Sequence, residues 1–105
     1  MIVEFRKYQS VAPFSQAQHD HVIPAGQVLF LNEIGGSSIP SDINAKVTIV
    51  FDPVGTTEML LATGAEARQS TTKRFDGDGI KVIRILLDNQ TATAKIMGGY
   101  FIGDS

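Results

Sequence analysis

Apolar and polar residues alternate along most of this chain with the period of two that is typical of β-strands. The spacing of three and four residues that marks an amphipathic helix does not persist beyond a turn or two. The pattern predicts about eight short strands separated by turn-forming residues at intervals of roughly 8 to 12 positions. The expected strands are Ile2–Tyr8, Gln18–Ile23, Val28–Leu31, Lys46–Phe51, Thr57–Thr63, Ile80–Leu87, Thr91–Met97 and Tyr100–Ile102.

The same alternation predicts which side of each strand faces the core. Val3 and Phe5 share one face of the first strand, and charged residues occupy the other face. Val28–Leu31 has no alternation, so we expect both of its faces to be covered, as in a central strand. The strongest strand signal is Ile80–Leu87, which is rich in β-branched residues. In that segment Ile83, Ile85 and Leu87 share one face, while Val82 and Leu86 share the other.

Glycine, proline and aspartate mark the expected connections. The triplet 24–26, Pro-Ala-Gly, reads as a tight turn between strands. Gly35–Asn44 is the longest region rich in turn formers, and we expect it to be an exposed loop. Ala65–Gln69 has a helix-compatible composition but is too short for a stable helix, so we interpret it as loop or strand. The pair Gly98-Gly99 inside a strand pattern predicts a bulge or a sharp bend.

These elements predict an all-β fold. The chain has 105 residues, which fits a single domain spanning residues 1–105 with one core. Short strands at regular turn spacing indicate an antiparallel β-sandwich, either jelly-roll-like or immunoglobulin-like.

Composition and charge exclude several classes of function. The chain has no cysteine, which removes disulfides, thiolate catalysis and cysteine zinc sites. Its net charge is −2 without a basic cluster, so we expect no nucleic-acid partner. The first residues carry charges where a signal peptide needs a continuous apolar segment, and no apolar run approaches the ~20 residues that span a bilayer. We therefore expect a soluble protein with no membrane partner.

The segment His19-Asp20-His21 holds both histidines of the chain. Residues two apart in a strand project to the same side, so both imidazoles can face one ion. A complete site would need a carboxylate from elsewhere in the fold, or several chains around a symmetry axis. We interpret the pair as solvent-facing histidines beside a turn, and we expect neither a metal nor a cofactor.

Other patterns that suggest chemistry are incomplete. Asp76-Gly77-Asp78-Gly79 resembles the opening of a calcium loop, but position 87 is leucine where the loop register needs an acidic residue, so we interpret it as a hairpin connection. The glycine-rich segments lack the following helix of a phosphate-binding loop, and no nucleophile-elbow pattern is present. A pair of carboxylates for glycoside chemistry remains open, since such groups need only be close in space. We expect that the protein is not an enzyme.

Four aromatic residues raise the possibility of a carbohydrate-binding strip. Tyr8, Phe14, Tyr100 and Phe101 can form such a strip if they are exposed together. Sugar platforms rely heavily on tryptophan, which this chain lacks, so we assign the four residues to core and edge packing.

Two segments carry a resemblance to a known group of proteins. Residues 22–34, with Pro-Ala-Gly followed by an apolar strand, and residues 81–89, together with the ending Gly-Gly-Tyr-Phe-Ile-Gly, resemble small β-sandwich structural proteins of tailed bacteriophages. These include head decoration proteins and tail or fibre-associated domains. The resemblance covers most of residues 20 to 103. It implies a virion component that self-associates and docks on a capsid or tail protein, located in the virion if phage-derived and otherwise in the cytoplasm.

Loops carry function on β scaffolds, so the expected docking surfaces are the Gly35–Asn44 loop and the Gln9–Gln18 segment. The interface residues we expect there are Ile39, Pro40, Ile43 and Phe14. Exposed strand edges and apolar patches also favour a homo-oligomer, with a trimer as the preferred state. The alternative function is a small ligand-binding module, for instance a carbohydrate-binding domain.

Overall fold

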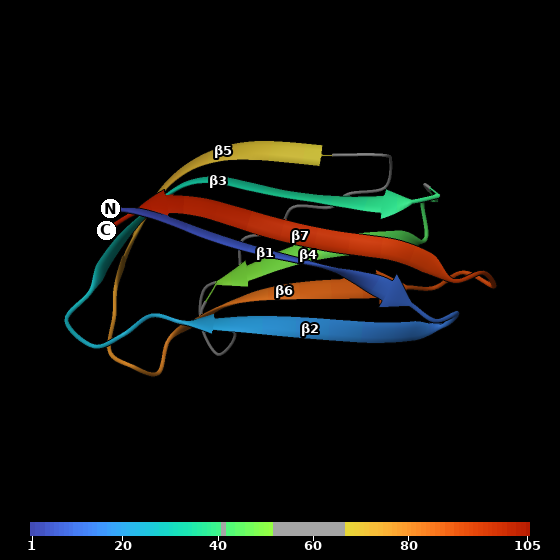
Figure 1. Cartoon of the computed structure of the whole chain (residues 1–105), viewed down its shortest axis with the longest axis horizontal. Coiled ribbons are helices and arrows are strands. Elements are labelled where there is room, and N and C mark those ends of the chain that lie inside the picture. The colour runs from blue at the N-terminus through green and yellow to red at the C-terminus, as the bar shows by residue number, and fades with distance from the viewer. Residues whose placement is uncertain (41, 52–66) are drawn as a thin grey trace.

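The computed structural model describes residues 1–40, 42–51 and 67–105, and these residues form seven β-strands in two antiparallel sheets (Figure 1). The all-β prediction is confirmed: no helix occurs in the described ranges. The strands are β1 (Ile2–Val11), β2 (Ser15–Val22), β3 (Val28–Ile39), β4 (Ala45–Phe51), β5 (Ala67–Asp76), β6 (Val82–Asn89) and β7 (Lys95–Asp104).

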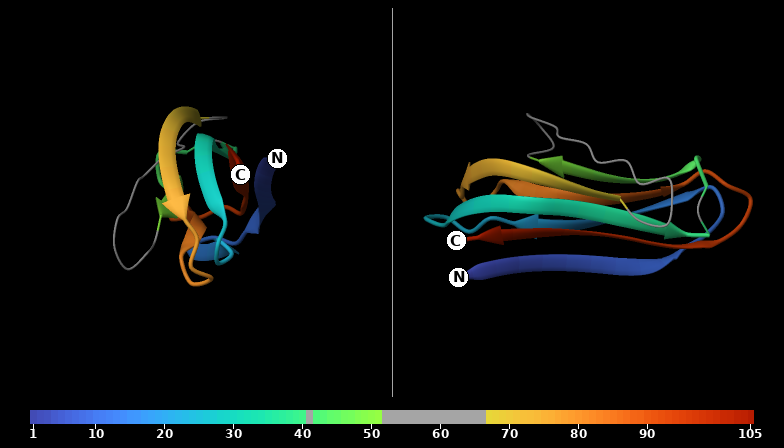
Figure 2. Two further views of the ribbon diagram at one scale, coloured as in Figure 1. Left: turned by 90° about the vertical axis from the view of Figure 1, so that its left-hand side faces the viewer. Right: turned by 90° about the horizontal axis from the view of Figure 1, so that it is seen from above.

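The strand order identifies the sandwich as a jelly roll. A four-stranded sheet with the order β1-β7-β3-β5 packs against a three-stranded sheet with the order β2-β6-β4, as the two views of Figure 2 show. Among the described strands, no two that follow each other in the chain belong to the same sheet. An immunoglobulin fold pairs its first two strands within one sheet. The jelly-roll alternative of the sequence prediction is therefore the one observed.

The core lies between the two sheets and follows the predicted alternation. Ile83, Ile85 and Leu87 of β6 are fully buried, and their neighbours on the other face are partly exposed. Val3 and Phe5 of β1 pack against this core from the edge of the four-stranded sheet. Burying a large aliphatic side chain contributes about 1.5–3 kcal/mol, so these rows supply much of the stability. The buried core residues are Val11, Ile23, Leu29, Leu31, Ile34, Ala45, Val47, Ile49, Ile83, Ile85, Leu87, Met97 and Phe101.

Strand β3 differs most from the sequence prediction. It continues through Gly35–Ile39, so the expectation that residues 35–44 form one exposed loop is wrong. Gly35 and Gly36 are buried because neighbouring side chains fill the space above them. The expectation that both faces of Val28–Leu31 are covered is also wrong, since Phe30 is 50% exposed while its two neighbours point into the core. The prediction that this is an inner strand is confirmed, because β3 lies between β7 and β5.

The pair Gly98-Gly99 does not interrupt β7. Both glycines keep a regular register with β1 and β3, so the predicted bulge at this position is wrong. The register shifts instead between Leu31 and Glu33 of β3. At its start, β7 is shorter than predicted, because it begins at Lys95 after a loop. The segment Ala65–Gln69 enters β5 at Ala67, and the strand predicted at Thr57–Thr63 lies outside the described residues.

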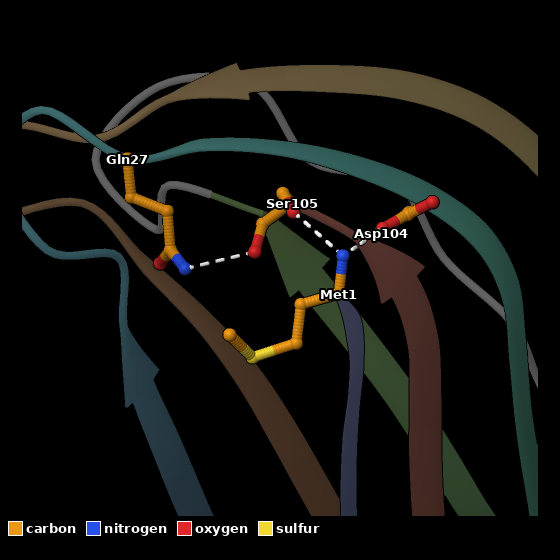
Figure 3. Close-up of polar contacts among 4 residues, drawn as sticks. All are labelled: Met1, Gln27, Asp104 and Ser105. Atoms are coloured by element: carbon orange, nitrogen blue, oxygen red, sulfur yellow. Dashed lines mark hydrogen bonds and ion pairs between the residues drawn. The ribbon is translucent and has the colours of Figure 1, made fainter.

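One end of the sandwich carries both chain termini, the β2–β3 loop and the β5–β6 loop, and we call it the terminal end (Figure 1). Main-chain hydrogen bonds join its two loops: Ile23 N to Lys81 O (2.9 Å), Gly79 N to Ile23 O (3.0 Å), Gly26 N to Gly77 O (3.3 Å) and Gly77 N to Gln27 O (2.7 Å). Nearby, the amino group of Met1 donates to Asp104 Oδ1 at 2.9 Å and to the carbonyl of Ser105 at 3.0 Å (Figure 3). This ammonium group lowers the pKa of Asp104.

The segment Asp76-Gly77-Asp78-Gly79 forms part of this end. It joins β5 to β6, which belong to different sheets, so it does not close the hairpin that the sequence suggested. The Asp78 carboxylate accepts hydrogen bonds from the main-chain N–H groups of Lys81 (2.7 Å) and Ile80 (2.8 Å), and these bonds lower its pKa. Gly79 has φ +80°, a conformation that favours glycine. The carboxylate therefore organises a turn.

Candidate functional site

The fold brings the expected interface residues together at the end of the sandwich opposite the termini. This end is formed by the β1–β2, β3–β4 and β6–β7 connections (Figure 1). Phe14 is 66% exposed, Ile39 58% and Ile43 73%, and Pro40 is exposed beside them. Ile96, which sequence reasoning missed, pairs with Ile39 across β7 and β3 and is 56% exposed. We call these five residues and their loops the apolar end.

Asn89 at the end of β6 holds two connections of the apolar end in place, the β1–β2 connection and the β6–β7 connection. It is fully buried, and its side-chain amide donates to the carbonyls of Val11 (3.0 Å), Ala12 (3.3 Å) and Thr93 (2.9 Å). Its carbonyl oxygen accepts from the N–H (3.1 Å) and the hydroxyl (2.6 Å) of Thr91. One side chain therefore bonds main-chain groups of two connections, and two of these groups, the Val11 carbonyl and the Thr91 N–H, are bonded within the buried interior.

Main-chain hydrogen bonds extend this frame to the residues that carry the apolar side chains. The N–H of Phe14 donates to Thr91 O at 3.2 Å, and the N–H of Gln90 donates to Asn44 O at 3.0 Å. Asp42 begins the approach to β4 and accepts from the N–H of Asn44 at 2.8 Å through its carboxylate. The exposed apolar side chains thus project from connections that are fixed to one another.

A second feature lies on the outer face of the four-stranded sheet. It is a pocket of about 310 Å³ lined by side chains of β1, β7, β3 and β5. Arg6, Tyr100, Gly35 and Arg68 occupy one row across the four strands, because each is the register partner of the next. The lining residues are Arg6, Tyr8, Glu33, Gly36, Ser37, Ile39, Arg68 and Tyr100.

Two glycines create the room for the tyrosine rings of this pocket. A Cβ atom at Gly98 would lie 1.9 Å from the Tyr8 ring, and a Cβ atom at Gly35 would lie 2.2 Å from the Tyr100 ring. Each ring therefore lies directly over the main chain of the neighbouring strand. Tyr8 remains 51% exposed, whereas Tyr100 is only 5% exposed. The glycines that suggested a loop and a bulge in the sequence instead form the floor beneath two aromatic rings.

Charged groups surround Tyr100. Its hydroxyl donates to Glu33 Oε2 at 2.6 Å, and the guanidinium carbon of Arg6 lies 4.3 Å from the ring centroid. Burial, reinforced by the Glu33 carboxylate, raises the pKa of Tyr100 to about 12. Arg6 also pairs with Glu4 on the same strand. The phenol thus stays protonated at neutral pH and acts as a hydrogen-bond donor, with its ring held between an arginine and the sheet.

The four aromatic residues of the expected strip do not form one surface. Phe101 is fully buried in the core, which confirms core packing for that residue. Phe14 lies at the apolar end, where its φ of +53° marks a tight turn. Only Tyr8 and Tyr100 contribute to the pocket on the outer face. The alternation within β7 explains the split, because Tyr100 and Phe101 are adjacent and point to opposite faces.

The two histidines share one side of β2, as predicted, but they are partly buried and not fully solvent-facing. His19 Nε2 lies 2.6 Å from Gln9 Oε1. His21 packs against Phe5 and Phe101 with ring centroids 5.3 Å away in each case, and burial lowers its pKa. Within residues 1–40, 42–51 and 67–105, no three His, Asp or Glu side chains gather in a geometry that suits a metal ion.

Comparison with protein-family models and with curated proteins finds no match to this chain. In the part of the chain that the structure describes, no helix is long and apolar enough to cross a membrane.

Proposed function

We propose that this chain is a non-enzymatic structural protein, a phage or prophage virion component that docks on a capsid or tail protein through its apolar end. The carrying observation is that three highly exposed apolar residues gather at one end: Phe14 on the β1–β2 connection, Ile39 at the end of β3 and Ile43 on the β3–β4 connection. Apolar side chains clustered at an exposed surface favour burial against a partner. The resemblance of residues 22–34 and 81–89 to small phage sandwich proteins supports the choice of partner.

The frame beneath these side chains supports docking rather than loop rearrangement. Connections fixed by Asn89 and by main-chain hydrogen bonds lose little conformational freedom when a partner covers them. A preorganised surface keeps more of its interaction energy as affinity, because less is spent on ordering the loops.

Recovery of the partner from the native host or virion tests this proposal. Burying an unpaired carboxylate at an apolar interface costs several kcal/mol, so Phe14→Glu and Ile43→Glu should reduce recovery of a capsid or tail protein more than tenfold. Ile80→Glu is the matched control, since Ile80 is 80% exposed at the terminal end. The proposal fails if Ile80→Glu has the larger effect, or if the tagged wild-type chain recovers no virion structural protein.

Self-association as a trimer is the second part of the proposal. Strands β1 and β5 are the edges of the larger sheet in the described residues, and β2 and β4 are those of the smaller one. Symmetric association would cover such edges. Light scattering should give the mass of three chains. A monomer at every accessible concentration would contradict this part and leave docking as a single copy.

The alternative function, a small ligand-binding module, is favoured by a different observation. The pocket on the outer face combines a half-exposed tyrosine with donors and acceptors within about 310 Å³. That volume lies at the lower end of the range of small-molecule sites. A ligand that occupies this pocket would leave Phe14 and Ile43 uncovered, so the two functions are compatible.

A further inference from the structure

We propose that the pocket on the outer face of the four-stranded sheet binds a neutral pyranose sugar, with Tyr8 as its stacking platform. The inference rests on the alternative function above and is independent of docking through the apolar end. It depends on the aromatic surface, the balance of charge and the size of the pocket.

Tyr8 supplies the aromatic surface. One side of its ring covers Gly98, where an added Cβ would lie within 1.9–2.5 Å of three ring atoms. The side chain nevertheless remains 51% exposed, so the ring offers surface to a ligand. A pyranose presents a face of C–H groups that packs on such a ring while its hydroxyls reach outward. Tyr100 does not serve this role, because the sheet, Arg6 and Glu33 already enclose it.

The charges of the pocket favour a neutral ligand with many hydroxyls. Arg6 and Arg68 are matched by Glu33 within the lining and by Glu4, which pairs with Arg6. An acidic ligand would meet no net positive charge. Guanidinium groups only donate hydrogen bonds and ionised carboxylates only accept them, whereas each sugar hydroxyl does both. A pocket that holds both kinds of group beside the Ser37 hydroxyl therefore matches the chemistry of a neutral sugar.

The geometry also limits the size of the ligand. Ser37 pairs with Gly98, and Gly98 pairs with Tyr8, whose ring covers Gly98, so the Ser37 hydroxyl and the Tyr8 ring belong to one row of the sheet. Together with the volume of about 310 Å³, this arrangement accommodates one or two sugar rings.

The test begins with an array of neutral and acidic glycans, followed by NMR titration with a disaccharide from the strongest neutral ligand. Amide shifts should concentrate at Tyr8, Ser37 and Gly98. Tyr8→Ala should weaken binding about three- to tenfold, the range expected for loss of an aromatic contact. Phe30→Ala is the matched control, because Phe30 is 50% exposed on the same sheet face and lies outside the pocket; it should leave the affinity unchanged.

Three results would overturn the inference: no neutral glycan binds, acidic glycans alone bind, or Phe30→Ala weakens binding as much as Tyr8→Ala. Ile43→Glu separates this inference from the docking proposal. Ile43→Glu should reduce recovery of the virion partner more than tenfold and leave the sugar affinity unchanged. Tyr8→Ala should weaken sugar binding and leave recovery of the virion partner unchanged. Ile39 is unsuitable for this separation because it belongs to both surfaces.

Discussion

The two ends of the sandwich differ in how the main-chain N–H and carbonyl groups of their loops find hydrogen-bond partners. At the terminal end, the β2–β3 and β5–β6 loops bond each other through their own N–H and carbonyl groups. At the apolar end, a single buried side chain, Asn89, reaches the carbonyls of two connections. The first solution depends on main-chain shape and the second on the identity of one residue. Both ends expose apolar side chains, Phe14 and Ile43 at the apolar end and Ile80 at the terminal end, so the difference between the ends lies in how their loops are held.

The largest predicted effect comes from removing the buried amide. Asn89→Ala leaves the carbonyls of Val11 and Ala12 without their donor and the buried N–H of Thr91 without its acceptor, while Thr93 O keeps the Thr91 hydroxyl. Each buried unsatisfied group costs about 1–3 kcal/mol. We expect the free energy of unfolding to fall by about 3 kcal/mol or more, measured by urea denaturation. A loss below about 1 kcal/mol would show that the apolar end does not depend on this residue.

The next effect tests the dependence of the terminal end on main-chain shape. A Cβ atom at Gly77 would lie 2.0 Å from Pro24 O, so Gly77→Ala must displace one loop from the other, and we expect a loss of about 2–3 kcal/mol. Gly26→Ala is the control: no atom lies within 4 Å of its Cβ position, and only its φ of +82° opposes the change. That strain costs about 1 kcal/mol. Equal losses in the two variants would contradict the role of close loop contact.

A smaller effect of opposite sign is expected near the apolar end. Ser38 is fully buried on β3, and its hydroxyl has no hydrogen-bond partner among the described residues. Ser38→Ala removes an unsatisfied group, so the free energy of unfolding should stay unchanged or rise by up to about 1 kcal/mol. Thermal denaturation measures this change. A clear decrease in stability would mean that the hydroxyl is bonded in solution.

The smallest predicted effect is a dependence of stability on pH, and its source is His21 on the edge strand β2. Its pKa in the folded state lies below the ordinary value of 6.5, because burial against Phe5 and Phe101 disfavours the charged ring. The unfolded chain therefore binds the proton first, so stability is complete above pH 6.5 and decreases as pH falls below that value. His21→Phe should flatten the pH profile of the unfolding midpoint between pH 7.5 and about 5.5. If the pH profile of the unfolding midpoint has the same slope in His21→Phe as in the wild type, groups other than His21 cause the pH dependence.

The sequence was informative wherever a strand buries one regular face. The predicted inward row of Ile83, Ile85 and Leu87 is fully buried because alternation directly encodes sidedness. The interpretation failed where glycine serves packing instead of turning. Gly35 and Gly98 occupy strand interiors because Tyr100 and Tyr8 lie over them, and these contacts link strands distant in the sequence. Local composition carries no information about such partners.

The same distinction between local pattern and contacts of distant strands applies to the two candidate surfaces. Phe14 and Ile43 were predicted as docking residues from loop position alone, but their convergence at one end follows from the jelly-roll order of the strands. The pocket was not predicted, since its row from Arg6 to Arg68 requires the register of four strands. The order and register of strands are set by the whole core, and a single sequence does not display them.

Hydrogen–deuterium exchange tests docking through the apolar end most directly, by comparing the free chain with the chain bound in its native particle. We predict slower exchange in the particle for the amides of Ala12 and Phe14 and of residues 42–44 and 90–94. The loops of the terminal end, at residues 24–27 and 77–80, should exchange at the same rate in both states. Protection confined to the terminal end, or equal exchange at the apolar end in both states, would contradict the account.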